Sequence, residues 1–163
     1  MQSAVQASRR QLPEAQVLLM DTAPAAILGC LKDPVVEKKT NVIAVNIGNG
    51  HTMAAIISKG GIQCLMEHHT CLLNPEKLER LLVNFADGNL ANEEVFREGG
   101  HGLFYLEEPS GFSKVNIIAV TGPNRKLASK TDLPCYFAVP GGDMMMTGPI
   151  GLIEATKRKY KND

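Results

Sequence analysis

Three strand-like segments joined by very short turns restrict the fold of this chain more than any other feature. The segments 41–47, 51–58 and 62–68 are apolar or alternate apolar with polar residues. The turn Gly48-Asn49-Gly50 contains Asn-Gly, the strongest short hairpin signal, and Lys59-Gly60-Gly61 is a second tight turn. The pattern predicts a three-stranded antiparallel meander. One interpretation of the first turn is purely conformational: Asn-Gly is there to adopt positive φ angles.

After the meander, helical patterns alternate with two further strands. A helix is predicted between Pro75 and Asp87, because apolar residues recur there at helical spacing. The other predicted elements are a helix over 92–98, a short helical piece at 103–106, strands at 116–120 and 136–139, and a final helix that ends near Tyr160. A meander followed by α/β crossovers gives a mixed sheet with helices covering its faces.

The first forty residues follow a different pattern. The apolar run Val17–Met20 predicts a buried strand. A small apolar helix is expected from Pro24 to Leu31, with proline in its first turn. Asp21 precedes this helix and is expected to cap it.

Composition excludes several classes of protein. The formal net charge is zero at pH 7, which gives no reason to expect nucleic acid or an anionic membrane as a partner. Residues 1–12 lack the apolar core of a secretory signal, and no stretch approaches the roughly 18–20 apolar residues that a membrane span needs. The four cysteines form no CxxC pair and are expected to be reduced, which points to the cytoplasm. A length of 163 residues suits one compact domain.

Four runs, spread over most of the chain, resemble motifs of actin-like ATPases. Val42–Thr52 resembles the second phosphate motif, a strand that ends in a glycine-rich hairpin. Ile117–Arg125 resembles the adenosine motif, Pro140–Ala155 the closing segment, and Asp21–Gly29 the helix that links the two lobes. The resemblance implies an α/β fold with a ribonuclease-H-like mixed sheet, in which parallel strands join the three-stranded antiparallel meander and helices lie on both faces. Such a unit is one lobe of an actin-like ATPase.

The resemblance also implies a division of the chain. Residues 1–40 would be the last strand and interdomain helix of a largely missing N-terminal lobe, and residues 41–163 the C-terminal ribonuclease-H-like lobe. Two-lobed members bind nucleotide between their lobes. The expected partners are therefore a nucleotide and either the missing lobe or a second copy of the chain, with no nucleic acid and no membrane.

More closely, the chain is similar to the C-terminal half of a microbial family labelled as pyruvate formate-lyase activating enzymes. The details that suggest it are Glu67-His68-His69-Thr70 after the third strand and Thr121-Gly122-Pro123 after the fourth. A radical-type activating enzyme holds an iron–sulfur cluster through three closely spaced cysteines. The four cysteines here, spread from residue 30 to residue 135, cannot supply that spacing, so no iron–sulfur cluster is expected.

The actin-like resemblance places ATP or ADP, with magnesium, against the hairpin. Backbone N–H groups can approach a phosphate closely where glycine lacks a Cβ. Asn46 stands where the superfamily usually has the aspartate that holds magnesium through water, so this lobe is expected to be incomplete as a catalyst. The candidates for a catalytic role are Asp21, Asn46 and His68. The expected nucleotide-binding residues are Asn46, Gly48, Asn49, Gly50, His51, Thr52, Gly122, Asn124, Arg125, Gly141 and Gly142.

These residues also have simpler structural explanations. Asp21 can be only a helix cap. Arg125 can be a solvated side chain in a turn rather than a platform for a purine ring, and Gly141-Gly142 can be a turn before a helix. Two other functions therefore stay open beside nucleotide binding: a non-catalytic assembly module that keeps the fold, and a metal or redox protein.

The metal hypothesis rests on Cys64, His68, His69 and Cys71, around the third strand. Alternation along a strand puts Cys64 and His68 on one face and the other two residues on the opposite face. Because this splits the ligands, no tetrahedral metal site is predicted. The segment Gly99-Gly100-His101-Gly102 is interpreted as a lid over the cleft or a break between helices.

Overall fold

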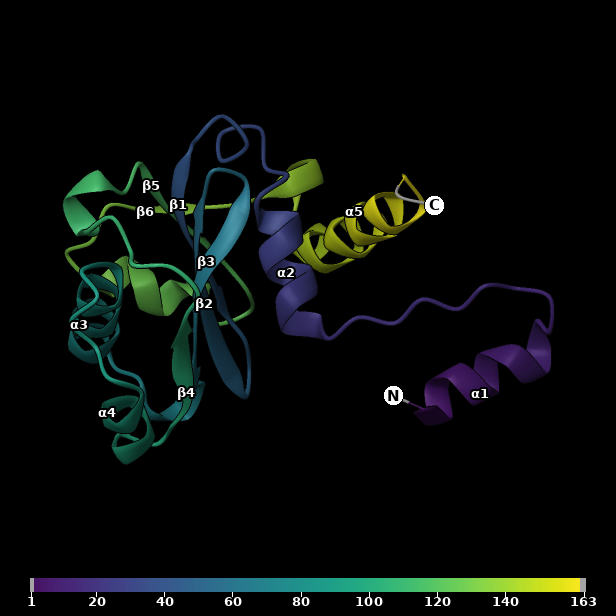
Figure 1. Ribbon diagram of the computed structural model, residues 1–163, viewed down its shortest axis with the longest axis horizontal. Helices are drawn as coiled ribbons and strands as arrows, with labels where there is room; N and C mark the ends of the chain where they lie inside the picture. Colours follow the sequence, from purple (N-terminus) through teal and green to yellow (C-terminus); the bar gives the residue numbers. More distant parts are fainter. Residues whose placement is uncertain (1, 162–163) are drawn as a thin grey trace.

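The fold is organised by one six-stranded sheet, seen in the computed structural model, which describes residues 2–161 (Figure 1). The strand order is β4-β3-β2-β1-β5-β6. β1 pairs antiparallel with β2 and parallel with β5, so the antiparallel and parallel halves of the sheet meet at β1. The strands are β1 (Asn41–Ile47), β2 (His51–Ser58), β3 (Gly61–His69), β4 (Gly100–Tyr105), β5 (Ile117–Thr121) and β6 (Cys135–Phe137).

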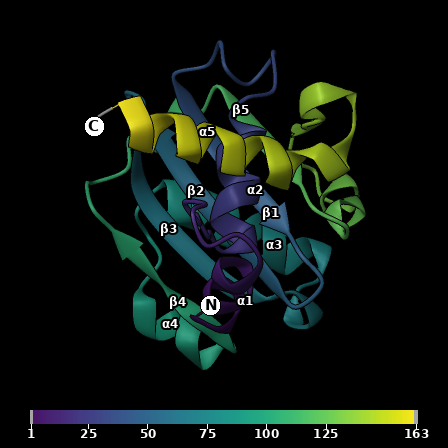
Figure 2. The same ribbon diagram turned by 90° about the vertical axis from the view of Figure 1, so that its right-hand side faces the viewer.

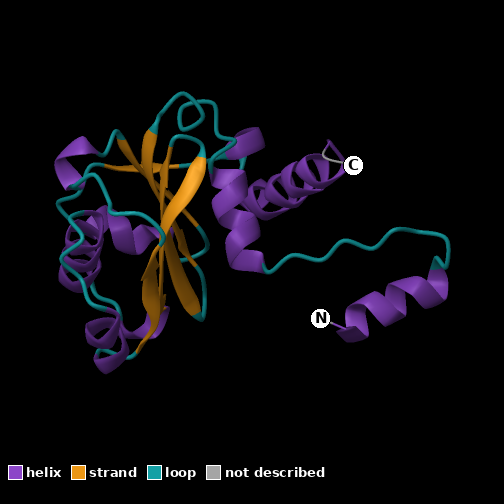
Figure 3. Ribbon diagram, viewed as in Figure 1, coloured by secondary structure: helices purple, strands orange, loops and turns teal. Residues whose placement is uncertain are grey.

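Helices cover both faces of this sheet (Figures 1 and 3). α3 and α4 lie on one face and α2 lies on the other, and α5 crosses α2 on the side away from the sheet (Figure 2). α1 stands apart from the sheet at the end of an extended segment and buries none of its residues. The helices are α1 (Gln2–Gln11), α2 (Thr22–Cys30), α3 (Pro75–Ala86), α4 (Asn92–Arg97) and α5 (Thr147–Lys161).

β1 forms the centre of the protein because both of its faces are buried. Ile43 and Val45 pack on the α3 side of the sheet in one apolar cluster, together with Phe85 of α3. Val42 and Ala44 point the other way and join a second cluster that contains Ile27 of α2. A strand covered on both faces is apolar throughout rather than alternating, which explains the continuous run at the start of β1.

The fold class expected from the sequence is confirmed. The meander is present as β1, β2 and β3, the parallel strands β5 and β6 extend it beyond β1, and helices lie on both faces. The strand order from β3 to β6 is that of a ribonuclease-H-like sheet, with β4 added at the outer edge. Asp21 caps α2 as expected: its carboxylate accepts from the Ala23 N–H.

Two predicted elements are wrong. Val17–Met20 forms no strand, because no neighbouring strand within residues 2–161 offers it a ladder of hydrogen bonds. The expected helical piece at 103–106 is instead the end of strand β4, which runs to Tyr105 and pairs antiparallel with β3. Its side chains alternate as in a strand, since Leu103 and Tyr105 pack against the core whereas Phe104 is exposed.

Among the residues that the structure describes, no helix combines the length and the apolar character needed to cross a membrane.

Candidate functional site

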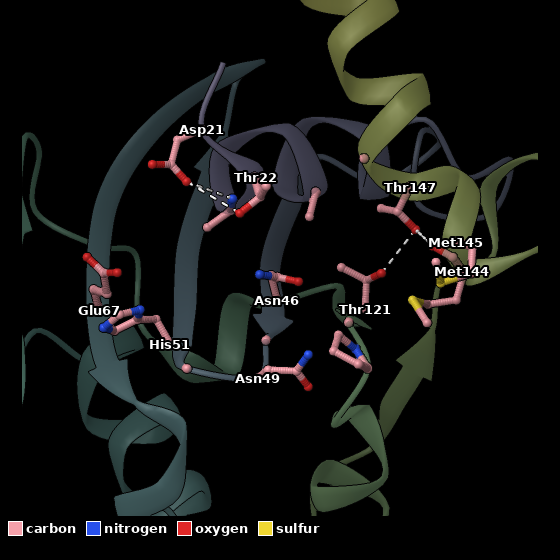
Figure 4. Close-up of a pocket in the computed structure, with 17 residues that line it drawn as sticks. Asp21, Thr22, Asn46, Asn49, His51, Glu67, Thr121, Met144, Met145 and Thr147 are labelled. Carbon is pink, nitrogen blue, oxygen red and sulfur yellow. Dashed lines mark hydrogen bonds between the residues drawn. The ribbon is translucent and has the colours of Figure 1, made fainter. Parts of the chain in front are cut away.

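A cleft of about 650 Å³ opens at the carboxyl ends of β1 and β5, beside the β1–β2 hairpin (Figure 4). Open α/β sheets bind ligands at this kind of position, where the direction of the strand order changes. Three groups line the cleft: the hairpin and strand ends (Asn46, Gly48, Asn49, Gly50, His51, Glu67, Thr121, Gly122, Pro123), the start of α2 (Asp21, Thr22, Ala23, Ala26), and the start of α5 with the turn before it (Met144, Met145, Thr147, Gly148).

The hairpin closes on a hydrogen bond of 3.0 Å, donated by the Gly48 N–H to the carbonyl oxygen of His51. None of Gly48, Asn49 and Gly50 has a positive φ, so the conformational interpretation of Asn-Gly is wrong. An ordinary β-turn is sufficient here. A Cβ on Gly48 would lie 2.7 Å from the His51 carbonyl oxygen, whereas a Cβ on Gly50 would meet nothing within 4 Å. The turn therefore requires glycine at position 48 but not at position 50.

Backbone donors of the hairpin are open to a ligand. Within residues 2–161, no acceptor partners the N–H groups of Asn49 and Gly50. Asn124 stabilises the turn through two hydrogen bonds. Its side-chain nitrogen donates to the Gly48 carbonyl oxygen at 3.0 Å and to the Asn49 side-chain oxygen at 3.2 Å. The Gly50 carbonyl oxygen accepts from the Thr70 N–H at 2.9 Å. The turn is thus fixed in place while two of its donors stay available.

Two helices begin at the edge of the cleft. Asp21, Thr22 and the first turn of α2 form one wall. α5 begins at Thr147, whose hydroxyl accepts a 3.0 Å hydrogen bond from the buried Thr121 hydroxyl, so the end of β5 is tied to the start of this helix. A helix N-terminus carries a partial positive charge and unpaired N–H groups. Both helix ends therefore favour an anion in the cleft.

Asn46, the residue before the last of β1, lies beside Thr121 of β5, and Figure 4 shows its amide pointing into the cleft. Gly122, with a φ of 100°, lets the loop after β5 approach this residue closely. A Cβ on Gly122 would lie 2.5 Å from the Ile47 carbonyl oxygen and 2.8 Å from Oδ1 of Asn46. Only glycine suits this position, because it adopts the positive φ and leaves room for both oxygens.

Among residues 2–161, two carboxylates line the cleft, those of Asp21 and Glu67. Asp21 is partly used by the α2 cap, and Thr22 Oγ1 also donates to its Oδ1 at 3.5 Å. Asn46 offers an amide oxygen in place of a charge. Carboxylate and amide oxygens both suit magnesium, but the cleft places no carboxylate at the end of β1.

Several residues expected at a nucleotide do not line the cleft. Thr52 is buried, with its hydroxyl 3.0 Å from the Thr70 hydroxyl. Arg125 lies in the 3-10 helix Arg125–Lys130, away from the cleft lining. Asn124 does not line the cleft but hydrogen-bonds to the Gly48 carbonyl oxygen. Gly141 and Gly142 also lie outside the lining, just before the turn that contributes Met144 and Met145 to it.

His68 and Cys64 face the opposite side of the sheet, which rules them out of the cleft. His68 is 1% exposed and packs toward the α3 side, whereas His69 lies beside His51 of β2. Burial lowers the pKa of His68, and a hydrogen bond to the His69 carbonyl oxygen offsets this only in part. Burial raises the pKa of the Cys64 thiol to about 11. The expected split of Cys64 and His68 from His69 is therefore present.

Sequence reasoning missed the contribution of the last helix and of Glu67. Thr147 and Gly148 line the cleft although they follow β1 by a hundred residues. The sequence did indicate that a helix starts here, because a threonine followed by Gly148-Pro149 is typical of a helix N-terminus. No local signal could place that helix start beside β1, because the placement depends on how α5 crosses α2.

Comparisons with known proteins agree with this architecture. A family model described as "Putative pyruvate format-lyase activating enzyme (DUF1786)" matches residues 1–127. Among solved structures, the chain is similar to the "Crystal structure of MreB5 of Spiroplasma citri bound to ADP", with a TM-score of 0.50 and 14% identity, over 99% of this chain and 67% of that chain. No curated protein matches. At this identity the likeness shows only that the two chains share an actin-like fold.

Proposed function

The chain belongs to the DUF1786 family, and from the geometry of its cleft we propose that it binds the phosphate groups of ATP or ADP as one lobe of an actin-like nucleotide-binding protein. The observation that carries the proposal is Gly50. The turn does not need glycine there, and a Cβ would stand in open space beside two unpartnered N–H groups. A bare backbone at this point lets an anion come within hydrogen-bonding distance.

The phosphates would lie between the hairpin and the starts of α2 and α5. Within the described residues, the cleft lining includes neither lysine nor arginine. Recognition would therefore rest on backbone N–H groups and helix N-termini, which suit an anion without adding a full positive charge. Such a half-site is expected to bind a nucleotide weakly unless other charges assist.

Magnesium and a second protein wall are the natural sources of that assistance. Asn46 cannot supply the charge of an aspartate, so Asp21 and Glu67 are the carboxylates that would help to hold a hydrated magnesium ion. The opposite wall would come from an N-terminal lobe or a second copy of the chain. With Asn46 at the end of β1, we infer that this lobe binds nucleotide without being a complete catalyst.

Isothermal titration of the protein with ADP and with ATP, each with and without magnesium, tests the proposal. Gly50→Ala is expected to weaken binding at least tenfold, because the added Cβ blocks the approach to the hairpin donors. Gly61→Ala is the matched control: it also changes a turn glycine without a positive φ, and its Cβ would meet no atom closer than 3.9 Å. Absence of binding to the wild-type protein would refute the proposal, as would equal affinities of the two variants.

A second candidate function, assembly without catalysis, is favoured by the outer face of α5. Leu152, Ile153 and Tyr160 of this helix are 37%, 54% and 43% exposed. Exposed apolar side chains grouped on one helix are typical of a protein contact. Light scattering of the wild-type protein and of Ile153→Glu tests this candidate. Self-association that the substitution abolishes supports it, and a monomer at all concentrations counts against a contact between copies.

A further inference from the structure

Three histidines from three neighbouring strands converge at the rim of the cleft. They are His51 of β2, His69 of β3 and His101 of β4, and one ring nitrogen from each lies within 4.8 Å of the others. Their ring centroids are 4.9, 4.8 and 4.4 Å apart in the three pairs. His51 and His101 are exposed and His69 is half-buried, so solvent and ions reach the group.

The convergence is not what a regular sheet produces. Neighbouring strands are about 4.8 Å apart, so side chains that project in parallel from β2 and β4 would be separated by about 9–10 Å. The rings of His51 and His101 are instead 4.8 Å apart. The outer two side chains therefore turn inward over His69, which lies directly opposite His51 in the β2–β3 register.

A β-bulge in the β3–β4 pairing accounts for the position of His101. Glu67 pairs with Gly102 and His68 pairs with Gly100, so His101 is the extra residue between two pairs. Bulges re-aim side chains and are frequent beside functional sites. The glycines flanking His101 hold this shape: Gly102 has a φ of 117°, and a Cβ on Gly100 would lie 2.5 Å from Val95 Cγ1.

We propose that His51, His69 and His101 bind a divalent transition-metal ion of the zinc class. Imidazole nitrogens suit zinc, copper and nickel, whereas magnesium and calcium prefer oxygen. Three nitrogens around tetrahedral zinc, each at about 2.0–2.1 Å from it, stand about 3.3 Å from one another. The present arrangement needs the three nitrogens to close by at most about 1.5 Å, which exposed side chains reach by small rotations about χ1 and χ2.

The fourth position of such an ion would open toward the cleft. His51 and Glu67 both line the cleft, and Figure 4 shows the Glu67 carboxylate beside the His51 ring. Three protein ligands with one open position are the arrangement of catalytic rather than structural zinc. Water, the Glu67 carboxylate or an anion in the cleft are the groups of suitable chemistry to complete it.

The site does not depend on the proposed nucleotide binding, and its test uses zinc alone. Tag-free protein, freed of metal with a chelator, is titrated with zinc chloride by calorimetry. One ion per chain is expected. His51→Gln and His101→Gln are each expected to weaken binding at least 100-fold, since each removes one of three ligands. Cys71→Ser is the control, because Cys71 is an exposed thiol near His69 that could itself bind zinc.

Imidazole nitrogen spectra identify the ligands directly. Zinc is expected to shift the ring resonances of three histidines and to leave those of buried His68, on the other face, unchanged. Thermal unfolding without metal verifies that the variants fold. Binding that both histidine variants retain would overturn the proposal, and so would binding that disappears only in Cys71→Ser.

Discussion

Gly29 of α2 and Gly151 of α5 meet where the two helices cross, with no room for a side chain on either. A Cβ on Gly29 would lie 1.8 Å from the Thr147 carbonyl oxygen, and a Cβ on Gly151 would lie 1.8 Å from the Ala25 carbonyl oxygen. The crossing joins two segments distant in sequence and brings both helix N-termini to the same cleft. The geometry of the proposed phosphate site therefore depends on two residues that do not line it.

Gly29→Ala and Gly151→Ala are each expected to destabilise the protein by about 3 kcal/mol, because a close-packed backbone contact must open to admit the methyl group. Gly148→Ala is the matched control in the same helix, since a Cβ there would meet nothing within 4 Å. That change should leave stability unchanged or raise it by up to about 1 kcal/mol. Urea unfolding measures the stability of all three variants. If the three were equally stable, the close contact between the two helices would be contradicted.

Asp33 joins the segment after α2 to β6 through hydrogen bonds that depend on its negative charge. This buried carboxylate accepts hydrogen bonds from the Val35 and Val139 N–H groups, both at 2.9 Å, and from the Tyr136 hydroxyl at 3.0 Å. Burial alone would raise its pKa, but the hydrogen bonds outweigh burial and the pKa is lowered. The segment after α2 is thereby attached to β6 and the strand end beyond it.

Asp33→Asn is expected to lower the free energy of unfolding at pH 7 by roughly 3 kcal/mol. Because the folded pKa lies below the unfolded value near 3.8, the contribution of the carboxylate is complete above that value. It is lost as the pH falls through the folded pKa. Urea unfolding of both proteins between pH 7 and pH 3 should show the gap narrowing below about pH 4. A gap that stays constant would contradict this role.

His68 adds a second loss of stability on acidification, at a higher pH than that of Asp33. Its Nε2 is buried and meets no hydrogen-bond partner among residues 2–161, and burial lowers its pKa. The folded protein therefore resists protonation of this ring, so stability is unaffected above the unfolded pKa of about 6.5 and falls as the pH drops below it. In His68→Leu this part of the pH dependence should vanish. The measurement is the difference in unfolding free energy between wild type and variant from pH 8 to pH 5, and a flat difference would contradict it.

Asn46→Asp tests whether the missing negative charge at position 46 limits the help that magnesium gives to nucleotide binding. A carboxylate at the end of β1 would add the negative charge that the cleft lacks there, so magnesium should strengthen ATP binding more in this variant than in the wild type. Asn46→Ala serves as the control, because it removes the amide without adding charge. Calorimetry with and without magnesium provides the comparison. An identical magnesium effect in all three proteins would show that position 46 does not face the metal.

The sequence predicted those parts of the structure that depend on local patterns. The turns at 48–50 and 59–61 identified the meander, and the motif order identified the sheet and the position of the cleft. The strand predicted at Val17–Met20 failed because a strand needs a neighbour, which four apolar residues cannot reveal. The helix predicted at 103–106 failed because pairing with β3, rather than local composition, decides that segment.

Only the site residues at the end of a strand or directly after it in the sequence could be predicted. Asn46 and the hairpin line the cleft because they end β1, and Gly122 lines it because β5 runs parallel to β1. Thr52 and Arg125, which motif analogy predicts at the nucleotide, do not line the cleft, since Thr52 is buried beside Thr70 and Arg125 begins the 3-10 helix after β5. The histidine cluster could not be read from the sequence, because it depends on cross-strand register and on the bulge at His101.

The most direct test of the account is a nitrogen-15 amide spectrum of the protein during titration with ADP. The two unpartnered hairpin N–H groups, on Asn49 and Gly50, should show the largest shifts, followed by amides at the starts of α2 and α5. Gly50→Ala should remove these shifts while Gly61→Ala keeps them. Saturable ADP binding that leaves Asn49 and Gly50 unmoved would contradict the proposed phosphate site.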